Sequence, residues 1–110
     1  MMVLIAIEPR AYRQTIGYTV QALRPRYMVD VIDPDRLRVE VQRRIPDVVL
    51  CSLPRTGISD EGPTWVEFRP YAGPTGTISV DGEDLGLEGV VEFADLLSIL
   101  DEAESLRRFA

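Results

Sequence analysis

The first half of the chain alternates short, largely apolar runs with segments of helical periodicity. The apolar runs span residues 3–7, 27–32 and 47–53, and the first of them stops at Glu8-Pro9. Runs of this length are typical of strands that are buried on both faces of a parallel sheet. We therefore predict three buried strands that are joined by right-handed helical crossovers.

Two helices are predicted between these strands. The first begins at Arg10 and ends before Pro25, which disfavours helical geometry at Arg24. Its apolar positions recur at helical spacing and are Tyr12, Ile16, Val20 and Leu23. The second begins at Asp33-Pro34, a capping residue followed by proline at the first helical position.

The second helix has a competing interpretation. As a helix it ends at Pro46 and has an apolar face made of Leu37, Val41 and Ile45. Leu37, Val39 and Val41 also alternate with a period of two, which is typical of a strand. The capping signal and the polar residues 42–44 favour the helix.

The second half of the chain breaks this rhythm. Residues 54–63 and 69–76 are rich in proline and glycine and predict loops on either side of a strand at 64–68. A short strand at 77–80 precedes Asp81-Gly82, a hairpin dipeptide that reverses the chain into residues 83–87. The apolar stripe of a final helix consists of Phe93, Leu96, Leu97, Leu100, Ala103 and Leu106.

The composition limits the catalytic and metal-binding groups that are available to this single domain, residues 1–110. The chain has no histidine, lysine or asparagine, so all 12 basic side chains are arginines. A Ser-His-Asp triad, a histidine-bound metal, a Schiff-base lysine and a phosphate-loop lysine are thereby excluded. The single cysteine, Cys51, lies in a predicted buried strand, which suits a core residue better than a nucleophile. We expect no cofactor, no metal and no enzymatic activity.

Charge is distributed unevenly along the chain. Residues 1–55 carry nine arginines and six acids, a net +3, whereas residues 56–110 carry three arginines and twelve acids, a net -9. This asymmetry fits a solvated acidic surface or a head-to-tail contact between subunits. An acidic protein with scattered arginines is a poor ligand for nucleic acid. No apolar run approaches the roughly 20 residues that span a membrane, and no signal peptide is apparent, so we expect a cytoplasmic protein without a membrane partner.

The predicted order, strand-helix-strand-helix-strand followed by two strands and a helix, resembles the receiver domain of bacterial response regulators. Residues 3–9 look like the first strand of that family with its acidic exit, and residues 46–54 look like its third strand. The resemblance implies an α/β, flavodoxin-like fold with a mostly parallel sheet of about five strands. It also implies that the helices after the third and fourth strands are reduced to loops.

The residues that this family uses for phosphorylation are absent. Aligned on residues 46–54, Ser52 stands where the phosphoacceptor aspartate is expected. Ala6 and Ile7 stand in place of the paired metal-binding acids, and the chain has no lysine to pair with the phosphoryl group. The resemblance thus implies a degenerate regulatory domain that is not phosphorylated on aspartate.

The two predicted loops leave one face of the sheet with only the second helix to cover it. We expect either Trp65 or the pair Val66 and Phe68 to be exposed on that face and to form an apolar interface. The predicted partner is a second copy of the chain, giving a homodimer, or another protein. The alternative is that residues 54–63 and 69–76 fold back over this face.

A second function class is the binding of a small anion or nucleotide. Ligands of open α/β sheets bind beyond the carboxyl ends of the strands, and Arg10, Arg55 and Arg69 each follow a predicted strand. Their guanidinium groups would grip a phosphate or carboxylate, with the Thr56 hydroxyl beside them. The alternative is that these arginines are ordinary solvated loop residues.

Overall fold

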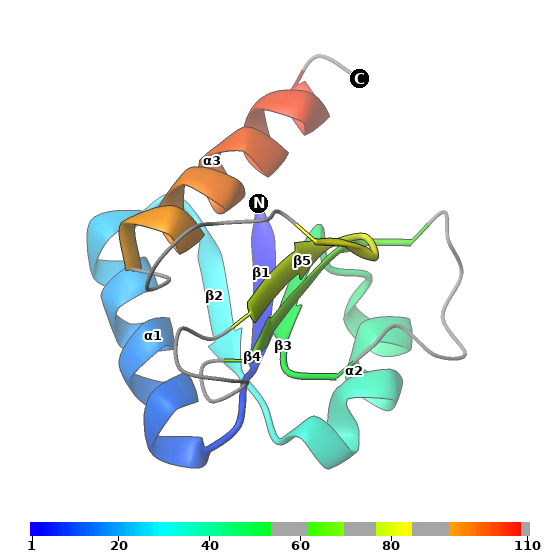
Figure 1. The fold of residues 1–110 in the computed structure, drawn as a ribbon. Helices are drawn as coiled ribbons and strands as arrows, with labels where there is room; N and C mark the ends of the chain where they lie inside the picture. The colour runs from blue at the N-terminus through cyan, green and yellow to red at the C-terminus, as the bar shows by residue number, and fades with distance from the viewer. Residues whose placement is uncertain (54–61, 70–76, 85–92, 109–110) are drawn as a thin grey trace.

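A six-stranded sheet in the order β2-β1-β3-β4-β5-β6 lies between helices on both of its faces (Figure 1). The structure is a computed structural model that describes residues 1–53, 62–69, 77–84 and 93–108. The parallel strands are β1 (Met2–Ala6), β2 (Met28–Val31), β3 (Val48–Cys51) and β4 (Thr64–Arg69). The antiparallel strands are β5 (Thr77–Val80) and β6 (Glu83–Asp84). The prediction of an α/β protein with a mostly parallel sheet is confirmed.

The parallel half of the sheet explains the apolar runs of the sequence. Val3 of β1 lies opposite Val29 on one side and Val48 on the other. All four side chains of β3 are buried, because this strand has a neighbour on each edge and a packed layer on each face. A strand in that position requires consecutive apolar residues rather than alternation.

In the described part of the chain, three helices pack against this sheet: α1 (Arg10–Leu23), α2 (Leu37–Arg44) and α3 (Phe93–Arg108). A short 3-10 turn, Pro34–Arg36, leads into α2, and the Asp33 side chain accepts a 2.9 Å hydrogen bond from the Asp35 backbone N–H. The helix predicted from the capping signal is therefore confirmed, and the strand alternative for residues 37–41 is wrong.

The helices divide the core into two layers, with α1 and α3 on one face of the sheet and α2 on the other (Figure 1). The first layer includes Val3, Ile5, Val48, Leu50, Val66 and Phe68 of the strands with Ile16, Val20, Leu96 and Leu100 of the helices. The second includes Leu4, Ala6, Val49, Cys51 and Trp65 with Leu37 and Val41. This is the distribution of helices that the sequence predicts.

The last strands form an antiparallel extension of the parallel sheet. Phe68 of β4 lies opposite Ile78 of β5, and β5 turns into β6 around Asp81 and Gly82. Both turn residues have positive φ, 52° and 89°, as a type I′ hairpin requires. The predicted hairpin is confirmed. The predicted loop residues 54–61 and 70–76, and the continuation of the hairpin into 85–87, lie outside the described residues.

Helix α1 approaches β2 closely, and Gly17 allows it to do so. A Cβ atom added to Gly17 would lie 2.3 Å from Cγ2 of Val31, well inside van der Waals contact. The inward positions of α1 are therefore Arg13, Ile16, Gly17 and Val20. Of the four apolar positions that recur at helical spacing, Ile16 and Val20 are buried, whereas Tyr12 and Leu23 are 36% and 50% exposed.

The prediction that Ile45 lies on the buried face of the second helix is wrong. Helix α2 ends at Arg44, and Ile45 follows it in the left-handed conformation, with φ 49° and ψ 62°. Its N–H still bonds to the Val41 carbonyl at 3.0 Å, but its side chain is 81% exposed. The reversal of the chain at this residue turns the side chain away from the core.

Candidate functional site

The three residues of the predicted degenerate phosphorylation site lie at the carboxyl end of the parallel strands. Ala6 lies opposite Cys51 in the sheet, Ile7 follows β1, and Ser52 follows β3. Ala6 and Ile7 are fully buried in the core. Two of these three positions at the carboxyl edge are therefore occupied by buried apolar side chains.

Ser52 joins three segments at this edge. Its Oγ donates a 2.9 Å hydrogen bond to the Phe68 carbonyl and accepts a 3.1 Å bond from the Glu8 N–H. The hydroxyl thereby ties the exit of β1 and the end of β4 to the end of β3. A hydroxyl can donate and accept at once, whereas an ionised carboxylate can only accept. Serine is therefore suited to this link in a way that aspartate is not.

The predicted anion-binding residues are only partly within the described chain. Arg69 at the end of β4 places Nη2 2.7 Å from Oε1 of Glu67, and its Nε donates a 3.3 Å hydrogen bond to the Ser52 carbonyl. Its guanidinium is thus engaged by a carboxylate and by the main chain. Arg10 is the exposed first residue of α1. Arg55 and Thr56 lie outside the described residues.

A different arginine, Arg13, is buried at this end, alone among the arginines that the structure describes there. It is 9% exposed, and its Nη1 donates a long hydrogen bond of 3.5 Å to the Ile7 carbonyl. Within the described residues no acidic side chain forms an ion pair with it. The signal in the sequence was its spacing, because Arg13 shares the helical phase of Ile16 and Val20 on the inward face of α1.

Cys51 is a core residue with an unreactive thiol. It is fully buried in β3, and its Sγ donates a 3.1 Å hydrogen bond to the Leu53 carbonyl. Burial raises the pKa of the thiol to about 12. Because the thiolate is the nucleophilic form, this environment opposes nucleophilic chemistry at neutral pH.

The predicted apolar interface on β4 is not exposed. Trp65, Val66 and Phe68 are 3%, 1% and 3% exposed, so the expectation that they form an open apolar patch is wrong. Val66 and Phe68 face α1 and α3. Trp65 faces the α2 side, where its indole N–H donates a 2.8 Å hydrogen bond to the Leu53 carbonyl.

Alternation along β4 explains why the thinly covered face is not apolar. The residues that share the α2 face with Trp65 are Glu67 and Arg69, which pair with each other. On β5, Ser79 lies opposite Glu67, and its hydroxyl is 3.4 Å from Oε2 of that carboxylate. Polar side chains therefore occupy the part of the face that α2 does not reach.

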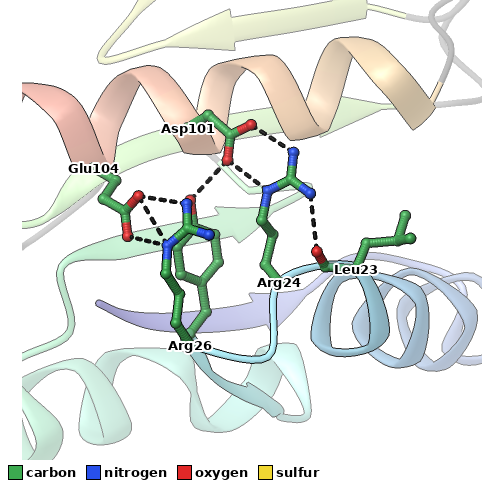
Figure 2. Close-up of polar contacts among 6 residues, drawn as sticks. Leu23, Arg24, Arg26, Asp101 and Glu104 are labelled. Carbon is green, nitrogen blue, oxygen red and sulfur yellow. Dashed lines mark hydrogen bonds and ion pairs between the residues drawn. The ribbon is translucent and has the colours of Figure 1, made fainter.

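Charged side chains concentrate at the opposite, amino end of the sheet. Figure 2 shows Arg24 and Arg26, which follow α1, directed at Asp101 and Glu104 of α3. Arg24 binds both carboxylate oxygens of Asp101, at 2.8 and 2.7 Å, and Arg26 grips Glu104 in the same forked manner. These contacts clamp α3 to the connection between α1 and β2.

Tyr27 completes this clamp from inside the core. Its ring is 2% exposed, its hydroxyl donates a 2.8 Å hydrogen bond to Oδ1 of Asp101, and the Arg26 guanidinium lies 5.0 Å from the ring centroid. The hydrogen bonds from Arg24 lower the pKa of Asp101 to about 2, and Tyr27 adds to the effect. Burial, followed by the bond to Asp101, raises the pKa of Tyr27 to about 12.

An exposed apolar pair lies at the same end of the sheet, on the α2 face. Met28 begins β2 and is 64% exposed, and Ile45 follows α2 and is 81% exposed. Arg44, the residue before Ile45, forms an ion pair with Asp30, which shares the face of Met28 on β2. We call Met28, Asp30, Arg44 and Ile45 the amino-end patch.

The described residues also bear on metal binding and on membrane insertion. No cluster of acidic or sulfur ligands among these residues is suited to a metal ion, and no helix among them is long and apolar enough to cross a membrane. Comparison of the whole chain with protein-family models, with curated proteins and with solved structures finds no match.

Proposed function

We propose that the chain is a receiver-like regulatory domain that acts without catalysis, by binding a second copy of itself. The strand order β2-β1-β3-β4-β5 supports a flavodoxin-like architecture, because doubly wound sheets of that class share it. The antiparallel β5 departs from that class, in which the fifth strand is also parallel. A receiver-like domain that has lost its phosphorylation site can still regulate by binding to another domain.

The side chains at the carboxyl end of the sheet support the proposal that the domain is not phosphorylated. Both hydrogen bonds of the Ser52 hydroxyl are used within the fold, and the Cys51 thiol is buried with a raised pKa. An activated nucleophile needs an adjacent base or a lowered pKa. We expect the mass of the intact protein to stay unchanged after incubation with an acyl phosphate donor. A phosphorylated species of high occupancy would contradict this part of the proposal.

The observation that carries self-association is the conformation of Ile45. A β-branched residue in the left-handed region is an outlier, and it costs roughly 1–2 kcal/mol that glycine would avoid. The exposed side chain recovers none of this through burial within the chain. Strain of this kind persists where a residue has a role outside its own core.

The composition of the amino-end patch suits a second copy as the partner. Its apolar pair, Met28 and Ile45, flanks a cation and an anion, Arg44 and Asp30. A two-fold axis brings identical patches together, so the exposed Met28 and Ile45 of one copy would be covered by the patch of the other. Gln21 blocks the simpler route of pairing β2 edge to edge, because its carboxamide bonds to the Val29 N–H and the Tyr27 carbonyl.

Sedimentation equilibrium over a range of protein concentrations tests this proposal. We expect a monomer–dimer equilibrium for the natural chain and a monomer for Ile45→Asn, since asparagine tolerates the left-handed conformation and removes the apolar contact. Tyr18→Ser is the matched control, because Tyr18 is 79% exposed on α1 and should not affect association. A natural chain that stays monomeric at every concentration, or an Ile45→Asn variant that dimerises normally, would contradict the proposal.

Small-anion binding is a second candidate function, and Arg13 is the observation that favours it. Arginine is seldom buried without a carboxylate, and among the described residues none pairs with Arg13, which lies at the end of the sheet where ligands bind. We expect phosphate or a nucleotide to raise the melting temperature of the natural chain but not of Arg13→Gln. Arg10→Gln provides an exposed control on the same helix. Equal stabilisation of all three proteins, or of none, would exclude Arg13 as the binding group.

A further inference from the structure

A cavity of about 410 Å³ opens between α1, α3 and the carboxyl end of β4. Helix α1 contributes Tyr12, Thr15 and Ile16, helix α3 contributes Phe93 and Leu96, and β4 contributes Phe68. Phe68 and Leu96 are almost fully buried, whereas Tyr12 is 36% exposed, so the cavity runs from the core to the surface.

Aromatic rings from three separate elements line this cavity. The rings of Tyr12 and Phe68 lie 6.3 Å apart between centroids, at an angle of 46°, and Phe93 comes from the first turn of α3. Tilted rings at this separation present both faces and edges to a third ring. The described lining contains no charged side chain, so nothing in it compensates the desolvation of a charged ligand.

The Thr15 hydroxyl gives the cavity a polar point on its α1 wall. Thr15 Oγ1 donates a 2.9 Å hydrogen bond to the Ala11 carbonyl, so its proton is committed and its oxygen retains acceptor capacity. A ligand N–H or O–H group is therefore the complementary partner. A few placed polar groups in a mostly apolar pocket are the usual source of ligand orientation.

The size of the cavity bounds the ligand. An apolar protein cavity of about 150 Å³ holds a benzene molecule, and small-ligand pockets begin at roughly 300 Å³. A volume of about 410 Å³ therefore admits one ring or two fused rings. Its position also fits a ligand site, because ligands of parallel α/β sheets bind beyond the carboxyl ends of the strands.

Two other cavities have a different character. The one between α3 and the β4–β5 hairpin, about 370 Å³, is lined by the acids Asp81 and Glu102. The one at the amino end, about 210 Å³, is lined by Asp47, Glu104 and Arg107. Carboxylates and a guanidinium in these walls disfavour an uncharged ring, which singles out the aromatic cavity.

We propose that the aromatic cavity binds a neutral, planar aromatic compound of one or two fused rings that carries a hydrogen-bond donor. Indole has this chemistry and is the probe for the test. The proposal does not depend on self-association, because the cavity and the amino-end patch lie at opposite ends of the sheet and share no residue.

The test is ligand-observed NMR with indole and with indole-3-carboxylate, on the full chain and two variants. We expect saturable binding of indole and binding at least tenfold weaker for the anionic analogue. Ala11→Leu should weaken indole binding at least tenfold, because residue 11 lines the cavity and its exposed side chain can grow without disturbing the core. Gln14→Leu, an exposed position of α1 outside the lining, should bind as the natural chain does.

Three results would overturn the proposal. The first is no saturable binding of indole, which includes the case in which the chain itself fills the cavity. The second is equal binding to Ala11→Leu and to the natural chain. The third is displacement of indole only by an apolar peptide that binds far more tightly than any single ring, which would assign the cavity to a protein side chain. Circular dichroism of both variants confirms that they are folded.

Discussion

The two ends of the sheet are held together by different forces. At the carboxyl end, the Ser52 hydroxyl joins strand exits by neutral hydrogen bonds, and an aromatic cavity adjoins them. At the amino end, Arg24 and Arg26 pair with carboxylates of α3 (Figure 2). Arg107 of α3 pairs with Asp47. Ion pairs at the amino end fix α3, whereas the carboxyl end has the Arg69–Glu67 ion pair on β4 and an apolar cavity.

This difference also explains the uneven charge of the chain. The basic residues Arg24 and Arg26 come from the half with a net +3, and their partners Asp101 and Glu104 come from the half with a net -9. Part of the asymmetry is therefore neutralised within one molecule. A head-to-tail contact between subunits is not needed to account for it.

The largest expected effect tests the carboxyl end. Ser52→Asp should lower the free energy of unfolding by about 3 kcal/mol, because a carboxylate cannot donate to the Phe68 carbonyl and is forced against it. Ser52→Ala should lower the free energy of unfolding by only about 1 kcal/mol. Urea unfolding followed by circular dichroism measures both. Equal stability of the two variants would mean that the hydroxyl does not link the strand ends.

Substitutions at the amino end should lower the free energy of unfolding by less than Ser52→Asp does. Asp101→Ala should lower the unfolding free energy by about 2 kcal/mol, mainly because the buried Tyr27 hydroxyl loses its acceptor. The Arg24 ion pair adds little, since solvent screens it. Glu104→Ala, which removes the more exposed pair with Arg26, is the control and should lose less than Asp101→Ala.

The same variant carries a pH signature. The folded-state pKa of Asp101, about 2, lies below the ordinary value of about 4, so the native state binds its proton more weakly than the unfolded state does. Its contribution to stability is complete above about pH 4 and disappears as the pH falls through about 2. The difference between the natural chain and Asp101→Ala should shrink over that interval. A difference independent of pH would contradict the clamp.

Replacement of Ile45 is expected to raise the stability of the fold. Ile45→Gly should raise the unfolding free energy by about 1 kcal/mol, because glycine adopts positive φ without strain. The comparison with the natural chain is made at low protein concentration, where association contributes least to apparent stability. Destabilisation by glycine would show that the side chain is supported within its own molecule.

The smallest effect concerns Cys51. Because burial raises the pKa of this thiol to about 12, a thiol reagent at about pH 8 should leave the folded protein unmodified and react fully in denaturing urea. Mass spectrometry measures the extent of modification. Rapid labelling without denaturant would show that the carboxyl end of β3 opens easily.

Local patterns predicted most of the elements and few of the site contacts. The buried strands β1 and β3, the Asp33 cap and the Asp81-Gly82 turn follow from interactions between neighbours in sequence, and the structure has them. The prediction that the second strand is also buried is wrong, because β2 lies at the edge of the sheet and is only partly covered. Ile45 differs, because the helix ends one residue before the periodicity does. Arg13 was missed for a related reason, since a charged side chain on an apolar face is read as exposed unless the helical phase is followed.

The interface prediction failed because it depended on long-range packing. Alternation along β4 correctly separates Trp65 from Val66 and Phe68, but it cannot say which of the two faces is covered or by what. The indole of Trp65 is satisfied by the Leu53 carbonyl, a contact between residues 12 apart in sequence. Such contacts form only after β3 and β4 have paired.

By itself, the sequence determined the kinds of elements and the chemistry that is excluded, because periodicity, caps and residue types act locally. The chain has no lysine, and Ser52 follows β3 where the resemblance to a receiver domain would require an aspartate. Only the tertiary structure decided that the arginines of one half meet the acids of the other, that Ile45 is presented to solvent, and that three aromatic residues surround a cavity. Those features join residues far apart in the chain, and their proximity depends on how the layers pack.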